Sequence, residues 1–270
     1  MAETFLPETE SFLSIQKWQQ KHPHLIAGFT TRNGGESKSP FDSLNLGLHV
    51  ADDKERIISN RKILAEQLGF PLENWVSGEQ VHHSNVHMVT LDDRGKGSTS
   101  YESSIQGTDG LITNESGVLC TAFFADCVPL YFYDPHTGYI GIAHAGWKGT
   151  VNRIAEKMVN KLQSIGVDVK NLLVAIGPCI SQEKYEVNDH VLQHIDPVLR
   201  ENTILQSGEG KFLLDLKQLN VEILLQCGVI RNNIDVTNYC TYTDQSLFFS
   251  HRRDQGKTGR MLGYIGYRRF

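Results

Sequence analysis

Apolar residues recur with helical spacing in several stretches of the chain. Over residues 151–162 they fall at alternating steps of three and one, which places them on one face of a helix. Thr150 is a suitable N-cap for this helix, and Gly166 lies near a suitable end. Two more helices are predicted, over Lys54–Leu68 and over Leu216–Gln226, the second with Asp215 as its N-cap.

Short apolar runs bounded by turn residues predict the strands. Residues 118–124 and Val128–Tyr133 form two such runs, and a turn over residues 134–138 joins the second to a third run over residues 139–144. This order predicts a hairpin. Further strands are expected over residues 86–90, 172–176, 234–237, 247–250 and 261–264. Hairpins mixed with strand–helix–strand units predict an α+β fold of mixed β-sheets with packed helices, not a purely parallel doubly wound fold.

Composition is that of an ordinary globular protein. Of the 270 residues, 40% are hydrophobic and 21% are charged, which is enough apolar material for a large core. No repeat, low-complexity tract or linker interrupts the chain, so we expect one compact catalytic domain over residues 1–270. The segment 92–110 is rich in Gly, Ser and Asp, and we expect a long surface loop there.

Charge and cysteine content limit the partners and the compartment. A net charge of -5 argues against nucleic acid as the main partner, because neutralising phosphates needs a basic face. The acidic start of the sequence lacks the features of a secretion signal, and no stretch approaches the roughly 18 apolar residues of a membrane helix. Five cysteines without a CxxC pair suit free thiols in a reducing compartment. We therefore expect a cytoplasmic monomer or small homo-oligomer that binds neither membranes nor nucleic acid.

Three potential metal ligands lie at the ends of strand-like runs. Cys127 and His144 flank the predicted hairpin, so their side chains are expected to meet, whereas His82 must arrive from another part of the chain. One thiolate and two imidazoles suit Zn²⁺, and Cu²⁺ is the alternative ion. Three protein ligands leave the fourth tetrahedral position for water or substrate, as in catalytic zinc sites. The spacing of the three residues matches no short generic zinc pattern.

The residues alone leave other interpretations open. Cys127 and His144 also suit a cysteine-dependent hydrolase or deamidase in which the imidazole activates the thiol, although His82 then has no role. A copper-dependent phenol oxidase and a non-catalytic metal or partner module are further alternatives. Asp126 is a candidate catalytic residue that orients a ligand or transfers a proton, and its other interpretation is a cap on the turn between two strands.

Candidate substrate-binding residues lie near glycine-rich turns. Arg32 occurs in a Thr-Arg-x-Gly-Gly segment, where backbone amides and a guanidinium together suit an anion. Lys148 precedes a predicted helix, so its charge and the helix dipole favour an anion there. Asn45 is a third candidate, although the hydrogen bonds of a turn explain it equally well. Trp147 and Tyr185 are able to stack on a purine or to pack in the core.

Several longer segments resemble the signatures of one known family. They are FTTRNGG (29–35), SLNLGLHV (43–50), QVH (80–82), TDG (108–110), ADCVP (125–129), HAGWKG (144–149), IGPCI (176–180), YEV (185–187) and SHRRD (250–254). Together they resemble the laccase-domain family, which is named for polyphenol oxidase-like activity and is unrelated to the multicopper oxidases. The resemblance spans nearly the whole chain.

The resemblance carries expectations about activity. It implies a zinc-dependent purine nucleoside phosphorylase acting on adenosine, inosine, guanosine and methylthioadenosine, with adenosine deaminase activity, and with purine nucleosides and phosphate as its partners. It also implies that His82, Cys127 and His144 are the metal ligands. The family often has glycine after the first ligand, where this chain has His83. We predict His82 as the ligand because it directly follows Gln80-Val81.

Overall fold

Two six-stranded sheets face each other at the centre of the molecule. The computed structural model describes residues 3–269. The first sheet has the order β1-β2-β3-β15-β7-β4, and the second has the order β14-β10-β8-β9-β6-β5. The strands of the first sheet, in that order, are Leu6–Pro7, Phe12–Ser14, Leu25–Thr30, Met261–Tyr267, Leu119–Phe124 and Trp75–Ser77. Those of the second are Ile234–Val236, Leu173–Ile176, Val128–Tyr133, Ile140–Ala145, Gly110–Thr113 and Val86–Met88.

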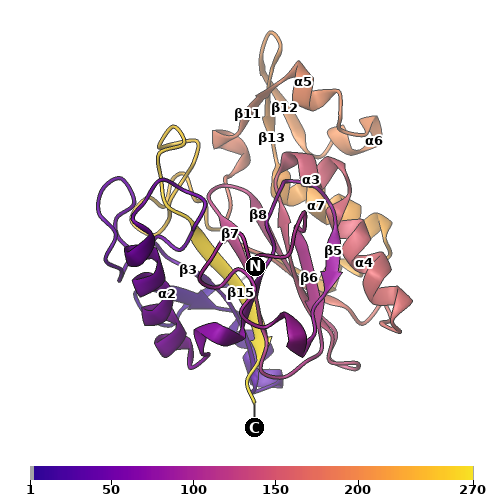
Figure 1. Cartoon of the computed structure of the whole chain (residues 1–270). Coiled ribbons are helices and arrows are strands. Elements are labelled where there is room, and N and C mark those ends of the chain that lie inside the picture. The colour runs from indigo at the N-terminus through magenta and orange to yellow at the C-terminus, as the bar shows by residue number, and fades with distance from the viewer. Residues whose placement is uncertain (1–2, 270) are drawn as a thin grey trace.

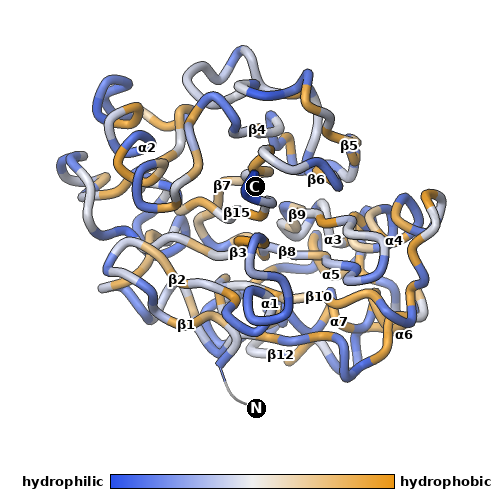
Figure 2. The backbone as a smooth tube through the Cα atoms, turned by 90° about the horizontal axis from the view of Figure 1, so that it is seen from below, coloured by the Kyte–Doolittle hydropathy of each residue, from blue (hydrophilic) through white to orange (hydrophobic). Residues whose placement is uncertain are grey.

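Helices cover the outer faces of both sheets and complete a four-layer arrangement. Figure 2 shows α2 beyond the first sheet, and α4 and α7 beyond the second. A small third sheet, β11-β13-β12, lies with α5 and α6 at the top of Figure 1. The helices are α1 (Gln16–Lys21), α2 (Lys54–Leu68), α3 (Trp147–Val151), α4 (Ile154–Ser164), α5 (Asp189–Leu192), α6 (Pro197–Arg200) and α7 (Leu216–Gln226). The third sheet comprises Glu186–Asn188, Lys211–Leu214 and Ile204–Gly208, and the short 3-10 helices η1 to η4 are Leu72–Asn74, Leu91–Asp93, Gln182–Lys184 and Arg231–Asn233.

Three apolar clusters hold the layers together. Between the sheets, the ring centroids of Phe29 and Phe124 lie 5.6 Å apart, and the rings of Tyr131 and Tyr133 are fully buried. A second cluster packs α4 and α7 on the outer face of the second sheet, and a third packs α2 on the first sheet. Burying each large apolar side chain contributes about 1.5–3 kcal/mol, so these interfaces fix how the strands lie.

The α+β fold with mixed sheets and packed helices is confirmed. Antiparallel pairs dominate, but β4 with β7, β5 with β6 and β10 with β14 are parallel. The predicted hairpin is formed by β8 and β9, and the Asp134 carboxylate accepts hydrogen bonds within its turn. The helix over Lys54–Leu68 is also confirmed, as is the helix over Leu216–Gln226 with Asp215 as its N-cap.

The helix predicted over residues 151–162 is interrupted. Arg153 has left-handed backbone angles (φ 60°, ψ 44°), so α3 ends before it and α4 begins after it. Thr150 lies inside α3, and the prediction of Thr150 as an N-cap is wrong because Arg153 occupies that position. The apolar face of α4 is fully buried as the spacing predicts, and the chain turns after it at Gly166 (φ 98°).

The strand predicted over residues 247–250 does not form. The backbone amides of Leu247 and Phe248 donate to the carbonyl of Asp244 in a turn. Phe248 and Phe249 are fully buried, and they join the cluster between the sheets from a loop. This apolar run therefore fills the core without pairing with another strand.

The loop predicted over residues 92–110 contains the end of η2 and a series of turns before β6 begins at Gly110. Its backbone is anchored by Arg61 of α2, whose guanidinium donates to the carbonyls of Gly97 and Ser98 at 2.7 and 2.8 Å. No helix in residues 3–269 is both long enough and apolar enough to cross a membrane.

Candidate metal centre

Three side chains with metal-binding atoms converge at one end of the β8–β9 hairpin. Cys127 lies between β7 and β8, and His144 on β9 is paired with Pro129 of β8. His82 reaches them from the loop between β4 and β5. One ligand atom from each of the three lies within 4.8 Å of the others, and Cys127 Sγ is 4.0 Å from His82 Nε2. His83 is not part of this group.

Backbone geometry allows the close approach. His82 and Asp126 both have left-handed φ values, 60° and 87°, which are uncommon for residues with a side chain and are held by the surrounding structure. A Cβ on Gly146 would lie 2.9 Å from Cys127 Sγ and 3.0 Å from His82 Cδ2. Glycine at position 146 therefore leaves room for two ligands that come from distant segments.

The carboxylate of Asp109 connects the segments that carry the two histidines. Its Oδ1 accepts hydrogen bonds from the His82 amide at 3.0 Å and from His144 Nδ1 at 2.9 Å. Its Oδ2 accepts from the amides of His83 and Val81. Because Nδ1 of His144 is engaged by Asp109, Nε2 is the ring nitrogen left to face a metal, an arrangement common behind metal-binding histidines.

Cys127 and His144 also perturb each other's protonation. Burial raises the pKa of the Cys127 thiol, but the neighbouring His144 and His82 outweigh it and lower that pKa to about 6. Burial lowers the pKa of His144, but the Cys127 thiolate and Asp109 outweigh it and raise that pKa to about 9. Without a metal, the two groups therefore form a thiolate–imidazolium pair near neutral pH. Metal binding must release the imidazolium proton, since a ligating histidine is neutral.

The donor set fits zinc. Zinc–sulfur and zinc–nitrogen bond lengths imply donor separations of about 3.3–3.6 Å in a tetrahedral site. Cys127 Sγ and His82 Nε2 are 4.0 Å apart, and all three ligand atoms lie within 4.8 Å of one another, so side-chain rotations that move the atoms by about 1 Å bring them to these separations. All three ligands line a cavity, so a fourth position faces open space. These residues therefore suit an ion with one exchangeable position.

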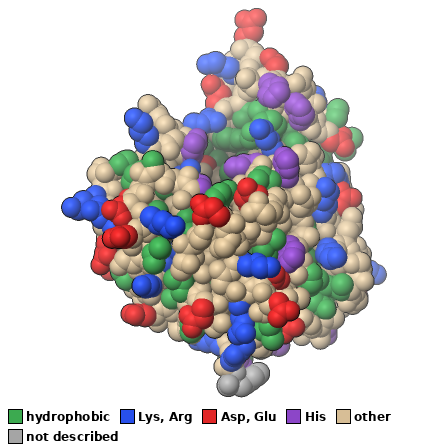
Figure 3. Space-filling view, in the orientation of Figure 1, with side chains coloured by type: hydrophobic (Ala, Val, Ile, Leu, Met, Phe, Trp, Pro, Cys, Tyr) green, Lys and Arg blue, Asp and Glu red, His purple; other side chains and the backbone are tan. Residues whose placement is uncertain are grey.

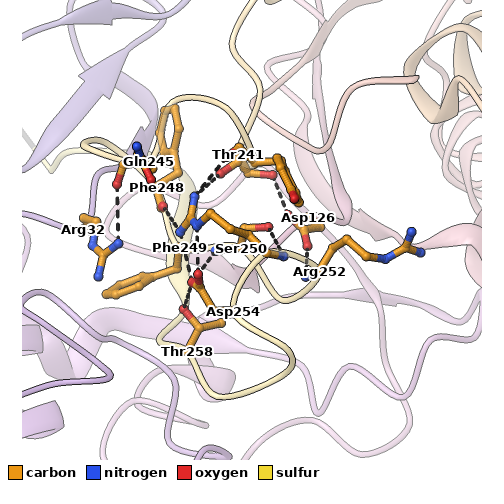
Figure 4. Close-up of polar contacts among 12 residues, drawn as sticks. Arg32, Asp126, Thr241, Gln245, Phe248, Phe249, Ser250, Arg252, Asp254 and Thr258 are labelled. Carbon is orange, nitrogen blue, oxygen red and sulfur yellow. Dashed lines mark hydrogen bonds and ion pairs between the residues drawn. The ribbon is translucent and has the colours of Figure 1, made fainter. Parts of the chain in front are cut away.

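Asp126 anchors a loop beside the centre. Its Oδ1 accepts from the Thr241 hydroxyl at 2.7 Å, and its Oδ2 accepts from the Arg252 amide at 2.7 Å. The guanidinium of Arg253 donates to the Thr241 carbonyl at 3.0 Å and pairs with Asp254 at 2.8 Å. Figure 4 shows this network joining Asp126 to the loop that carries Arg252. Both oxygens of Asp126 are thus engaged in holding that loop.

The cavity beside the three ligands has a volume of about 500 Å³, within the range of about 300–1,000 Å³ typical of small-molecule sites. Trp147 and Tyr185 line it, and each has a cation over its ring. Lys148 Nζ lies 5.8 Å from the Trp147 ring, and the Arg252 guanidinium lies 4.9 Å from the Tyr185 ring. Figure 3 shows histidine side chains gathered around a hollow on this face of the molecule.

Two of the predicted substrate-binding residues are not among the residues that line this cavity. Arg32 donates to the carbonyls of Asp42 and Gln245 and lies 4.6 Å from the Phe249 ring centroid. Asn45 is fully buried and bonds to other protein groups. Lys148 and Asp126, in contrast, both line the cavity with the three ligands.

Sequence reasoning assigned no role to two residues that the structure brings to the site. Asp109 was visible only within the TDG segment, and nothing in its spacing shows that it contacts His144, 35 residues later. Arg260 lies in no segment singled out by the sequence, yet its side chain lines the cavity. Only the pairing of distant strands places either residue beside the metal ligands.

Sequence and fold are similar to those of known proteins. The family model described as "Multi-copper polyphenol oxidoreductase laccase" matches residues 26–268. "Purine nucleoside phosphorylase YlmD" of Bacillus subtilis is 45% identical over 264 residues, covering 96% of this chain and 95% of that protein. The protein of the same name from Geobacillus stearothermophilus is 48% identical over 247 residues, with 90% of each chain covered. The crystal structure of Bacillus licheniformis hypothetical protein YfiH gives a TM-score of 0.95 at 42% identity, covering 99% of this chain and 100% of that one.

Proposed function

The chain belongs to the family described as multi-copper polyphenol oxidoreductase laccase, and from this membership we propose that it is a zinc-dependent purine nucleoside phosphorylase with adenosine deaminase activity. The relatives named purine nucleoside phosphorylase cover nearly its whole length, which supports one catalytic domain over residues 1–270. The substrates are adenosine, inosine, guanosine and methylthioadenosine, together with phosphate. Five free cysteines suit a reducing compartment, and we place the protein in the cytoplasm.

One observation carries the proposal: His82, Cys127 and His144 converge on a single point at the wall of a cavity large enough for a small ligand. A zinc ion held there supplies a Lewis acid with an exchangeable position. Aromatic side chains on the same cavity, Trp147 and Tyr185, offer flat surfaces for a purine. Structural zinc sites, in contrast, are closed by four protein ligands.

In phosphorolysis, a phosphate oxygen forms a bond to C1 of the ribose while the bond from C1 to the purine nitrogen breaks. The products are ribose 1-phosphate and the free base, which takes up a proton. Positive charge near the phosphate holds the nucleophile in place, and a proton donor assists the leaving base. Arg252, Lys148 and Arg260 provide positive charge on the cavity wall. Deamination of adenosine at the same site replaces the C6 amino group with water oxygen and releases ammonia.

Two carboxylates beside the ligands hold the surrounding segments in place. Asp109 fixes the ring of His144 and the backbone at His82. Asp126 has both oxygens bonded to the loop that carries Arg252, so we assign it a positioning role beside Cys127. Proton transfer by Asp126 would require it to give up one of these bonds.

The thiolate–imidazolium pair favours one alternative function. A metal-free Cys127 with its pKa lowered to about 6 beside His144 also suits nucleophilic catalysis, as in a thiol hydrolase or deamidase. That alternative gives no role to His82. Copper-dependent phenol oxidation is the other alternative. Residues 3–269 contain no second cluster of three metal-binding side chains of the kind formed by His82, Cys127 and His144.

Metal analysis combined with a phosphate-dependent assay tests the proposal. We expect about one zinc per chain in the purified protein, and loss of both zinc and purine release in Cys127→Ala. Cys227→Ala is the matched control, because Cys227 is a half-buried thiol at the end of α7 and does not line the cavity. Full activity in chelated, metal-free protein would favour the thiol hydrolase. Zinc-only protein that oxidises phenols but releases no purine would favour the phenol oxidase.

A further inference from the structure

Arg260 is a cation on the cavity wall that interacts with Cys127 and Asp126 only at a distance, without a direct ion pair. Its Nη1 donates to the carbonyls of Thr258 and Gly259 at 2.9 and 3.0 Å. Its Nε and Nη2 make no hydrogen bond, and no carboxylate in residues 3–269 forms an ion pair with it. A guanidinium remains charged in proteins, and burying it without a direct counter-ion is unfavourable. The free Nε and Nη2 together form an edge that matches two oxygens of a phosphate.

His49 lies beside Arg260 on the same wall. A Cβ placed on Gly47 would lie 2.7 Å from Arg260 Cγ and 3.4 Å from His49 Cε1, so both side chains pack against one glycine. Desolvation within the pocket, with the charges of Arg260 and Arg61, lowers the pKa of His49 to about 3. The ring is therefore neutral at physiological pH, and it is able to donate one hydrogen bond without adding a second charge.

Asn45 holds these two residues together. Its Oδ1 accepts from the Arg260 amide at 2.9 Å and from the Gly47 amide at 3.1 Å. The Leu46 amide donates in turn to the Arg260 carbonyl at 3.1 Å. Asn45 and Arg260 are 215 positions apart in the sequence. The fully buried amide side chain of Asn45 therefore fixes the segment that carries His49 relative to the segment that carries Arg260.

The other cations on the cavity wall are differently placed. Lys148 and Arg252 are exposed, and Arg252 also donates to the Glu186 carbonyl at 2.9 Å. Exposed cations are hydrated and screened, so they attract an anion without holding it in one orientation. Arg61 is fully buried and does not line the cavity, and its guanidinium donates to backbone carbonyls through all three nitrogens. Among the three Lys and Arg residues that line the cavity, Arg260 alone combines partial burial with free donors.

We propose that Arg260 and His49 form the subsite that binds inorganic phosphate, and that Asn45 is the positioning residue that keeps the subsite intact. This inference rests on the proposed function for the identity of the anion. Arg260 binds two phosphate oxygens through Nε and Nη2, and His49 donates to a third. A phosphate oxygen left unbound then forms the bond to C1 of the ribose while the base departs.

Separate measurements of phosphate binding and of turnover test the subsite. Inorganic phosphate is titrated calorimetrically into the zinc-loaded protein and into Arg260→Met, Arg260→Lys, His49→Leu and Lys161→Met. We expect Arg260→Met to weaken phosphate binding at least about tenfold, as loss of charge-assisted hydrogen bonds implies, with zinc content unchanged. Arg260→Lys should recover part of the affinity, and Lys161→Met should change it by less than about threefold, because Lys161 is an exposed residue of α4 that does not line the cavity.

Steady-state kinetics distinguishes the subsite from the proposed function. In Arg260→Met and Asn45→Ala the KM for phosphate should rise while the KM for the nucleoside stays near that of the wild type, which a general loss of structure would not produce. If Arg260→Met fails to fold, His49→Leu serves in its place, since that ring is exposed to the cavity. If the wild type is active and the folded variants keep the wild-type KM for phosphate, the subsite is overturned while the proposed function stands. Arg260-dependent phosphate binding without phosphorolysis overturns the proposed function and leaves the anion site standing.

Discussion

Replacing Asp109 with asparagine removes a carboxylate that contacts the segments carrying both histidine ligands. Each oxygen of Asp109 accepts two hydrogen bonds, from the amides of Val81, His82 and His83 and from His144 Nδ1. An asparagine amide retains one of the two oxygens. In either orientation its NH₂ group therefore faces two N–H donors.

The magnitude follows from those four bonds. Hydrogen bonds to a charged group contribute about 1.5–3 kcal/mol each, and part of the loss is offset where freed amides reach water. We therefore expect Asp109→Asn to lower the free energy of unfolding by about 3 kcal/mol. Because His144 also loses its orientation, zinc affinity should fall about 10–100-fold, the range typical of partners that orient metal ligands.

The assay compares zinc affinity with stability. Zinc affinity is measured by competition with a chromophoric chelator, and the free energy of unfolding by urea denaturation. Asp93→Asn is the matched control, because Asp93 is also a buried carboxylate with several polar partners, including Lys96 at 2.7 Å, and does not line the cavity. It should lose stability and keep its zinc affinity. If Asp109→Asn loses stability but keeps the zinc affinity of the wild type, Asp109 does not orient the metal ligands.

Three further predictions concern stability and thiol reactivity. Burial raises the pKa of Asp93, but Lys96, Thr90 and His87 outweigh it and lower that pKa from 3.8 to about 2. The ionised carboxylate should therefore add about 2 kcal/mol to the free energy of unfolding above pH 4, and this should be lost as the pH falls toward 2. Urea denaturation of wild type and Asp93→Asn at several pH values checks this. Gly28→Ala places a Cβ 2.2 Å from the Leu13 carbonyl oxygen and should lower the free energy of unfolding by about 3 kcal/mol. Gly69→Ala has open space around the new Cβ but a φ of 60°, and it should lower the free energy of unfolding by only about 1 kcal/mol. Equal losses in the two variants would contradict this. In metal-free native protein a maleimide should label the half-buried Cys127 much faster than the fully buried Cys120, and zinc should protect Cys127; mass spectrometry of peptides shows whether it does.

Local sequence patterns were sufficient where one segment determines its own structure. The apolar face of α4 and the cap of α7 are encoded within a few residues each, so their spacing predicts them. The β8–β9 hairpin is similar, because its turn and both strands are contiguous. That hairpin also explains why Cys127 and His144 were predicted to meet. Their proximity requires only that two adjacent strands pair.

Patterns that do not distinguish a strand from a buried loop led to the errors. Residues 247–250 are apolar enough for a strand, yet Phe248 and Phe249 enter the core from a turn. The helical periodicity continues through Arg153, which gives no local sign of its left-handed backbone. In both places, contacts with distant parts of the chain decide the conformation.

By itself, the sequence determined the helices, the hairpin and a set of ligand types suited to zinc, because these depend on side-chain chemistry and on neighbours along the chain. Only the tertiary structure decided which groups surround those ligands. Asp109 reaches His144 through pairing between strands, and Arg260 reaches Asn45 across 215 positions. Such contacts form only when segments far apart in the chain pair or pack, and no period or motif along the chain records them, because their energy arises only when both segments have already folded.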